Sequence, residues 1–132
     1  MESPTSIARV FDRALAADPA REALVTRSAR LTYGELDALA DRAAYALADL
    51  GVRPGDRVAA SLPNEWEVVV AFHGAMRLGA IWVGVNRALA APEKRYLLGD
   101  CGASLLLTDD EVGDVGVRVV DLATWRAAID AA

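Results

Sequence analysis

The chain has 132 residues, of which 54% are hydrophobic and 25% charged, and its formal net charge is -5. This length and composition are typical of one globular domain with an ordinary packed core, and they exclude a largely disordered chain. The 14 basic residues are scattered along the sequence rather than gathered in a stripe, so nucleic acid is not an expected partner.

Cysteine usage and the N-terminal sequence bear on the cellular compartment. Cys101 is the only cysteine, so the chain cannot form an intrachain disulfide, and nothing indicates an oxidising compartment. The N-terminus lacks the basic start and apolar run of a signal peptide, and no later stretch approaches the ~20 apolar residues of a membrane span. We therefore expect a cytoplasmic protein without a membrane span.

The first part of the chain predicts a helix, a hairpin and a second helix. Apolar side chains recur at spacings of three and four over residues 7–17, and short apolar segments flank a polar turn within residues 23–32. Thr32 and Glu35 then form a capping box that begins a helix, and Gly51 supplies the left-handed residue that commonly ends one.

A turn, a strand and an apolar helix come next. Residues 54–55 are a Pro-Gly pair that fits the centre of a tight turn, and Asp56 is expected to hydrogen-bond the backbone of that loop. The apolar run at 58–62 is typical of a strand buried on both faces. Asn64 and Glu67 then predict a second side-chain cap, and the helix that follows is apolar nearly all round.

The remaining sequence alternates strands with helices. We expect strands at 80–85, 104–109 and 115–121, a helix opened by Pro92, and a final helix capped by Asp121. Apolar strands that alternate with helices are typical of a parallel sheet covered on both faces. The sequence therefore predicts an α/β fold: an open, mostly parallel sheet with helices on both faces, plus a small N-terminal hairpin, in one domain spanning 1–132.

Few residues carry recognisable chemistry. The chain has no glycine-rich phosphate-binding loop and no metalloprotease, serine-hydrolase or paired-cysteine motif. His73, the only histidine, lies in mid-helix without partner residues, so we expect a structural histidine, and we expect Cys101 to be inert. Four carboxylates within 108–114 lack the order of a calcium loop, and we expect a solvated strand-to-helix connection with Asp109 or Asp110 as a cap.

Six short motifs, taken in order, resemble the amino-terminal region of the adenylate-forming enzymes, the superfamily of acyl-CoA synthetases, peptide-synthetase adenylation domains and luciferases. The residues that carry the resemblance are Thr32-Tyr33-Gly34-Glu35-Leu36, Leu50-Gly51 with Gly55-Asp56-Arg57-Val58, Pro63-Asn64 with Glu67, Gly79-Ala80, Asn86, and Leu98 with Asp100, Gly102-Ala103 and Asp109. Together they cover nearly the whole chain, so the expected fold is a partial lobe of the adenylate-forming fold.

The resemblance implies ATP-dependent activation of a carboxylic acid to an acyl-adenylate, which then passes to a thiol, usually that of coenzyme A, with Mg²⁺ assisting. In this family the phosphate-gripping loop, the adenine and ribose contacts and the catalytic lysine lie downstream of the region matched here. The resemblance therefore assigns no catalytic residue and no metal ligand to this chain, and ATP, Mg²⁺ and coenzyme A are implied only for the full-length enzyme.

One residue is a candidate for a cofactor contact. Some acyl-CoA ligases of this family carry an arginine in an Asn-Pro-Arg-Leu context that can meet a phosphate of coenzyme A, and the corresponding run here is Asn86-Arg87-Ala88-Leu89. Because the arginine stands one position earlier than in the family pattern, two interpretations of Arg87 are open. It is either a cofactor-binding residue or an exposed surface charge.

We expect an amino-terminal structural segment of an ATP-dependent acyl-activating ligase that is not catalytically competent alone and whose partner is the remainder of the ligase polypeptide. A helix face at Val68, Val69 and Phe72 would then lack cover, and the isolated chain should self-associate through an exposed sheet edge. Two alternatives stay open: a free-standing scaffold or interaction domain with this fold, and a small nucleotide-binding domain that uses the carboxyl ends of its strands.

Overall fold

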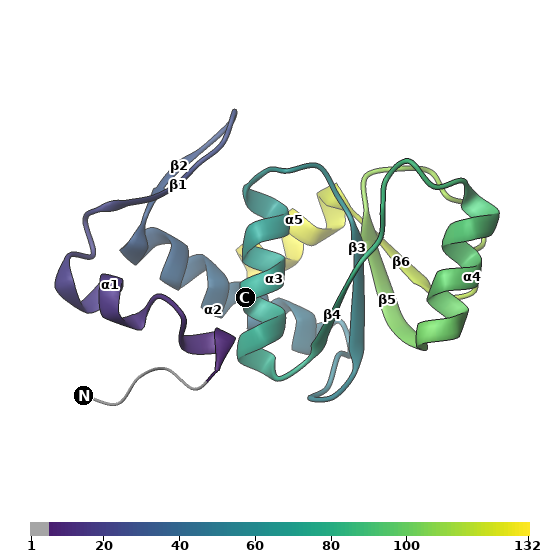
Figure 1. Cartoon of the computed structure of the whole chain (residues 1–132), viewed down its shortest axis with the longest axis horizontal. Coiled ribbons are helices and arrows are strands. Elements are labelled where there is room, and N and C mark those ends of the chain that lie inside the picture. Colours follow the sequence, from purple (N-terminus) through teal and green to yellow (C-terminus); the bar gives the residue numbers. More distant parts are fainter. Residues whose placement is uncertain (1–5) are drawn as a thin grey trace.

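A four-stranded parallel sheet lies at the centre of the structure, a computed structural model that describes residues 6–132 (Figure 1). Its strands are β3 (Arg57–Ser61), β4 (Ile81–Gly84), β5 (Ala103–Thr108) and β6 (Arg118–Asp121), in the order β4-β3-β5-β6. All three pairings are parallel. The apolar runs therefore lie side by side and point the same way, which confirms the predicted α/β sheet.

The two faces of the sheet separate along each strand with a period of two, as side chains of a strand alternate. In β3, Val58 and Ala60 belong to one buried cluster and Ala59 to the other, while in β5 Leu106 faces away from its two leucine neighbours. The side chains on both faces of the sheet are apolar because helices cover both faces.

Three helices cover one face of the sheet and a single helix lies on the other (Figure 1). The first group is α2 (Tyr33–Asp49), α3 (Trp66–Leu78) and α5 (Leu122–Ala131), and the lone helix is α4 (Ala91–Cys101). The chain leaves β3 toward β4 through α3 and returns past β3 to β5 through α4. Right-handed crossovers in opposite directions require α3 and α4 to lie on opposite faces, as observed.

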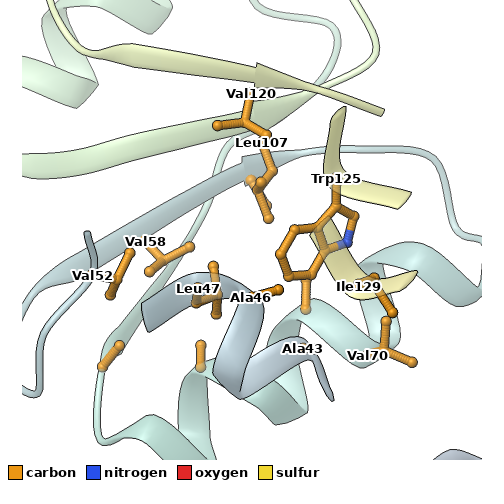
Figure 2. Close-up of a cluster of buried hydrophobic side chains, with 14 of the residues drawn as sticks. Ala43, Ala46, Leu47, Val52, Val58, Val70, Leu107, Val120, Trp125 and Ile129 are labelled. Carbon is orange, nitrogen blue, oxygen red and sulfur yellow. The ribbon is translucent and has the colours of Figure 1, made fainter. Parts of the chain in front are cut away.

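The larger cluster fills the space between the sheet and its three helices. Figure 2 shows Trp125 and Leu47 pointing into this space beneath Leu107, and all three are fully buried. The indole Nε1 of Trp125 donates to the backbone oxygen of Glu67 at 3.2 Å, so its polar atom is satisfied. The α2 helix packs directly on α3, and it provides the outer cover that the all-round apolar character of α3 predicts.

The N-terminal elements differ from the expectation in one respect. A short 3₁₀ helix η1 (Ile7–Arg9) and helix α1 (Asp12–Ala17) replace the single helix predicted over 7–17, which was therefore wrong. The break falls at Phe11, whose backbone leaves the helical region at φ -107° and ψ 15°. Its ring is buried against α3, so tertiary packing overrides the helical periodicity. Strands β1 (Glu22–Val25) and β2 (Arg30–Thr32) form the predicted antiparallel hairpin.

The predicted helix caps at Thr32 and Asp121 are confirmed. The Thr32 hydroxyl accepts from the Glu35 backbone N–H at 3.1 Å while the Glu35 carboxylate accepts from the Thr32 N–H at 3.0 Å, and the Asp121 carboxylate accepts from the Thr124 N–H at 2.8 Å. The predicted cap at Asn64 was wrong, because α3 begins after Glu65 without a side-chain cap. The carboxylate of Glu67, which was expected to complete that cap, pairs with Arg126 instead.

The turn at residues 54–55 is confirmed, since Gly55 has φ +87° and the Asp56 carboxylate accepts from the Arg53 N–H at 2.8 Å. The bare helix face expected on α3 was wrong. Val68, Val69 and Phe72 are half-buried, the first two against the larger cluster and the last against the edge of Trp82. No helix within residues 6–132 is long and apolar enough to cross a membrane.

Candidate functional site

Buried polar side chains gather at one edge of the sheet. Within residues 6–132 the buried polar or charged residues are Ser61, Glu67, Lys94 and Thr108. Ser61 and Thr108 end β3 and β5, and the other two lie in the first turns of α3 and α4, the helices that follow β3 and β4. All four are therefore at the carboxyl edge, where open α/β sheets bind their ligands.

The strand order identifies the point on this edge that is most favourable for ligand binding. The order β4-β3-β5-β6 corresponds to a 2-1-3-4 arrangement of successive strands, in which the two crossovers diverge between β3 and β5. Ser61 and Thr108 are direct register partners there. The Thr108 hydroxyl accepts from the Asp110 backbone N–H at 3.2 Å, whereas the Ser61 hydroxyl is buried without a hydrogen-bond partner.

Two ion pairs tie the loop after β5 to the elements that follow β4. Nη2 of Arg87, in the loop after β4, lies 2.7 Å from a carboxylate oxygen of Asp109, in the loop after β5. Nζ of Lys94 lies 3.4 Å from a carboxylate oxygen of Asp110. The Arg87 side chain is 46% exposed, so its guanidinium is anchored by Asp109 but open to solvent. The candidate cofactor residue is thus at the ligand-binding edge of the fold.

The acidic run at 108–114 does not have the role that the sequence predicted. It connects β5 to β6 without an intervening helix, so neither Asp109 nor Asp110 is a helix cap. Their carboxylates pair with Arg87 and Lys94 instead. The strand-to-helix interpretation was wrong because the connection from β5 to the parallel strand β6 is made by a loop alone.

A hollow of about 310 Å³ opens on the other side of the carboxyl edge, between the hairpin tip, α3 and α5. Its floor is an ion pair in which Nε of Arg126 lies 2.8 Å from the nearly buried Glu67 carboxylate. At its rim the Ser28 hydroxyl donates to Glu65 at 2.8 Å. Hydrogen bonds from Thr26 and then Ser28 hold the pKa of the Glu65 carboxyl below its usual value.

Neither histidine nor cysteine chemistry is present at this edge. His73 lies in the middle of α3, edge-on to Phe11 and to Phe72, and burial followed by the charge of Arg77 lowers its pKa. This is the expected structural histidine. Cys101, half-buried at the end of α4, donates to the backbone oxygen of Leu98.

The residues at this edge do not fit a bound ATP or Mg²⁺. No group of three His, Cys, Asp or Glu side chains in the described part of the chain could hold a metal ion. The two basic side chains near the switch point, Arg87 and Lys94, are each already paired with a carboxylate. Sequence reasoning missed Lys94, although its place one turn before the buried Leu98 on α4 is a detectable signal of burial.

The comparisons with known proteins show the family of the chain. The model of a family described as AMP-binding enzyme matches residues 11–130. The chain belongs to the AMP-binding enzyme family. Two of its relatives are the long-chain-fatty-acid–CoA ligase FadD13 of Mycobacterium tuberculosis, 45% identical over 59% of this chain, and a medium/long-chain-fatty-acid–CoA/3-oxocholest-4-en-26-oate–CoA ligase of Mycolicibacterium smegmatis, 34% identical over 90%.

Two solved structures share the fold over nearly the whole chain. The N-terminal domain of FACL13 from M. tuberculosis superimposes on 98% of this chain with a TM-score of 0.88 and 29% identity. An anthranilate CoA ligase bound to anthranoyl-AMP covers 99% with a TM-score of 0.88 and 27% identity. The chain spans only 16% and 22% of the two sequence relatives and 37% of the FACL13 domain. It therefore matches one part of an acyl-CoA ligase N-terminal domain.

Proposed function

We propose that this chain is the amino-terminal structural segment of an ATP-dependent acyl-activating ligase. In that enzyme, residues outside this chain convert the carboxylate to an acyl-adenylate and then to an acyl-CoA. The observation that carries the proposal is the match of nearly the whole chain to about a third of the FACL13 N-terminal domain.

The segment contributes the carboxyl edge of a parallel sheet. The turn at residues 54–55 and the cap at Thr32 set the entry of β3 and α2. The ion pairs of Arg87 and Lys94 hold the loop after β4 and the start of α4 against the loop after β5. Arg87 is the one proposed contact to a cofactor. Its half-exposed guanidinium can exchange Asp109 for a phosphate of coenzyme A, because both are oxyanions that an arginine binds through planar N–H groups.

The proposed partner is the remainder of the ligase polypeptide, and the proposed compartment is the cytoplasm. ATP, Mg²⁺ and coenzyme A would be cofactors of the whole enzyme. Two other functions remain distinguishable by experiment. A small nucleotide-binding domain draws support from the unpartnered Ser61 hydroxyl at the switch point, and it would gain heat stability with ATP by mass action. A free-standing scaffold would bind neither nucleotide nor ligase.

A chimera tests the proposal. The part of FadD13 that corresponds to this chain is replaced by residues 6–132, and formation of acyl-CoA from fatty acid, ATP and coenzyme A is measured. We expect activity within about tenfold of the parent, a difference of about 1.4 kcal/mol in barrier. Arg87→Ala in the chimera should raise KM for coenzyme A and leave KM for ATP unchanged, while Arg27→Ala at the exposed hairpin tip changes neither. A folded but inactive chimera would refute the proposal.

A further inference from the structure

The N-terminal arm, which we define as residues 6–17, lies on the far side of α3 from the sheet (Figure 1). Neither η1 nor α1 contains a buried residue, and Phe11, which lies between them, is the one buried side chain of the arm. Ile7 and Val10 are each 55% exposed. The arm therefore contributes a single side chain to the larger cluster.

Hydrogen bonds do not hold the arm to the rest of the chain within residues 6–132. Its backbone bonds all end within residues 6–18, and its side-chain bonds at Ser6 and Arg9 reach only two or three residues along the arm. The first anchor comes after the arm, where the Gly34 N–H donates to the Pro19 carbonyl oxygen at 2.9 Å. The exposed residues 18–20 therefore provide a hinge between the arm and the folded core.

The Phe11 ring is held by side chains of α2 and α3. Its centroid lies 6.1 Å from the ring of Tyr33 and 5.1 Å from the ring of His73, the latter at an interplanar angle of 73°. The Arg77 Cζ atom lies 5.1 Å from the same centroid, so the guanidinium makes a cation–π contact with the ring. Docking of the arm therefore depends on one aromatic ring between a histidine and an arginine.

His73 is the group in this contact whose charge can change near neutral pH. It is the only histidine of the chain, and histidine ordinarily titrates between about pH 5 and 8. The charged groups on its own helix and on the elements packed against it form two sets, Arg77 with Asp37 and Asp41, and Arg9 with Asp12. Each carboxylate in these sets is already paired. A proton on His73 therefore adds a positive charge beside Arg77 without a carboxylate of its own.

Protonation of His73 opposes docking of the arm. Burial, and then the charge of Arg77, lowers the pKa of His73 below its ordinary 6.5, and the Phe11 ring is part of what buries the imidazole. Moving the arm away returns the imidazole to water, so the released state binds the proton more tightly than the docked state. Docking is therefore strongest above about pH 6.5 and weakens as the pH falls below that value.

We propose that Phe11 and His73 form a pH-sensitive contact that holds the N-terminal arm on the core at neutral pH and releases it in mild acid, while the sheet and its helices stay folded. The released arm exposes the Phe11 ring together with Ile7 and Val10, which are already exposed. The proposal goes beyond the proposed function and does not rest on it, because it concerns contacts within residues 6–132 alone.

Hydrogen exchange of the 132-residue chain at about pH 7 and about pH 5.5, corrected for the intrinsic exchange rates, tests the proposal. A helix of six residues is not stable without packing, so the amides of α1 exchange when the arm is released. We expect their exchange to rise about threefold at the lower pH, and at most about eightfold, the limit if the docked imidazole binds no proton. The amides of α2 should not change.

Three variants separate the arm contact from general acid sensitivity. His73→Phe keeps an aromatic ring without a titrating group, so the exchange of α1 should become equal at the two pH values. Phe11→Ala should make the arm exchange fast at both, while Val10→Ala, at an exposed neighbouring position, should behave as the unmodified chain. No pH effect in the unmodified chain, the same effect in His73→Phe, or equal acceleration in α2 would overturn the proposal.

An NMR titration of the single histidine tests the same coupling in the reverse direction. If protonation of His73 releases the arm, loss of the Phe11 contact must change the proton affinity of His73 by the same factor, because coupling between two sites is reciprocal. Phe11→Ala should therefore raise the pKa of His73 toward 6.5, and Val10→Ala should leave it unchanged. An unchanged His73 pKa in Phe11→Ala would contradict the proposal.

Discussion

Replacing Gly74 by alanine probes the contact between α2 and α3, the two helices that complete the larger cluster. A Cβ at Gly74 would lie 2.7 Å from the Ala43 Cβ, 2.8 Å from the Ala43 carbonyl carbon and 2.8 Å from the Ala44 nitrogen. Two of these atoms belong to the backbone of α2 and cannot rotate away. The helices must therefore separate, and overpacking of this kind costs about 1–3 kcal/mol or more.

The same substitution has a favourable component, since alanine exceeds glycine in helix propensity by about 1 kcal/mol. With the clash at the upper end of its range, we expect Gly74→Ala to lower the free energy of unfolding by about 2 kcal/mol, or the melting temperature by about 8 °C. Gly99→Ala is the matched control: it is an exposed helical glycine in α4 with nothing within 4 Å of its Cβ, and it should stabilise by about 0.5–1 kcal/mol.

Urea unfolding of both variants measures the two differences. If Gly74→Ala were as stable as Gly99→Ala, α2 and α3 would not approach each other as closely as the structure shows, and the reasoning about the helical layer would be wrong.

Three further predictions use the same unfolding assay. Burial, and then Arg77, lowers the pKa of His73 below its ordinary 6.5, so the folded state resists protonation; stability should fall as the pH drops from about 7 to 5.5, and His73→Gln should flatten that slope. Arg126→Met leaves the Glu67 carboxylate unpaired and should cost about 2 kcal/mol, less than a fully buried pair because Arg126 is half-exposed; adding Glu67→Gln should restore part of it, and additive losses would exclude the coupling. Thr32→Ala should cost about 1 kcal/mol through the lost cap, and no change would deny the capping box a role in stability.

The parallel sheet could be predicted from the sequence because several local signals agree with the global fold. Apolar runs near residues 60, 83 and 106 alternate with helices whose starts and ends are marked by Thr32, Pro92 and Gly102, and each signal is a short-range consequence of backbone chemistry. The local structures that these signals predict are kept in the folded chain, because tertiary packing is compatible with them.

The wrong predictions at residues 7–17 and at Asn64 share one cause, which is contact between residues far apart in the sequence. The 7–17 helix breaks at Phe11 because the ring packs against α3, and the cap predicted at Asn64 fails because the expected carboxylate of Glu67 is taken up by Arg126 on α5, 59 residues away. Local patterns do not encode such distant partners.

The candidate site was predictable only in part. Arg87 was identified through the family resemblance, and the structure puts it at the carboxyl edge. The carboxylate that holds it, Asp109, was expected to cap a helix. Ser61, Thr108 and Lys94 had no sequence signal of function, because their proximity depends on the register of β3 with β5 and on the side of the sheet that α4 covers.

The claim that this chain supplies a fold while the chemistry lies in other residues is tested most directly by titrating the isolated chain with MgATP in a calorimeter. We expect no heat of binding up to millimolar nucleotide and no carboxylate-dependent exchange of pyrophosphate into ATP. A saturable heat at micromolar concentration, removed by Ser61→Ala or Lys94→Met, would contradict it and would make the carboxyl edge of this sheet a nucleotide site in its own right.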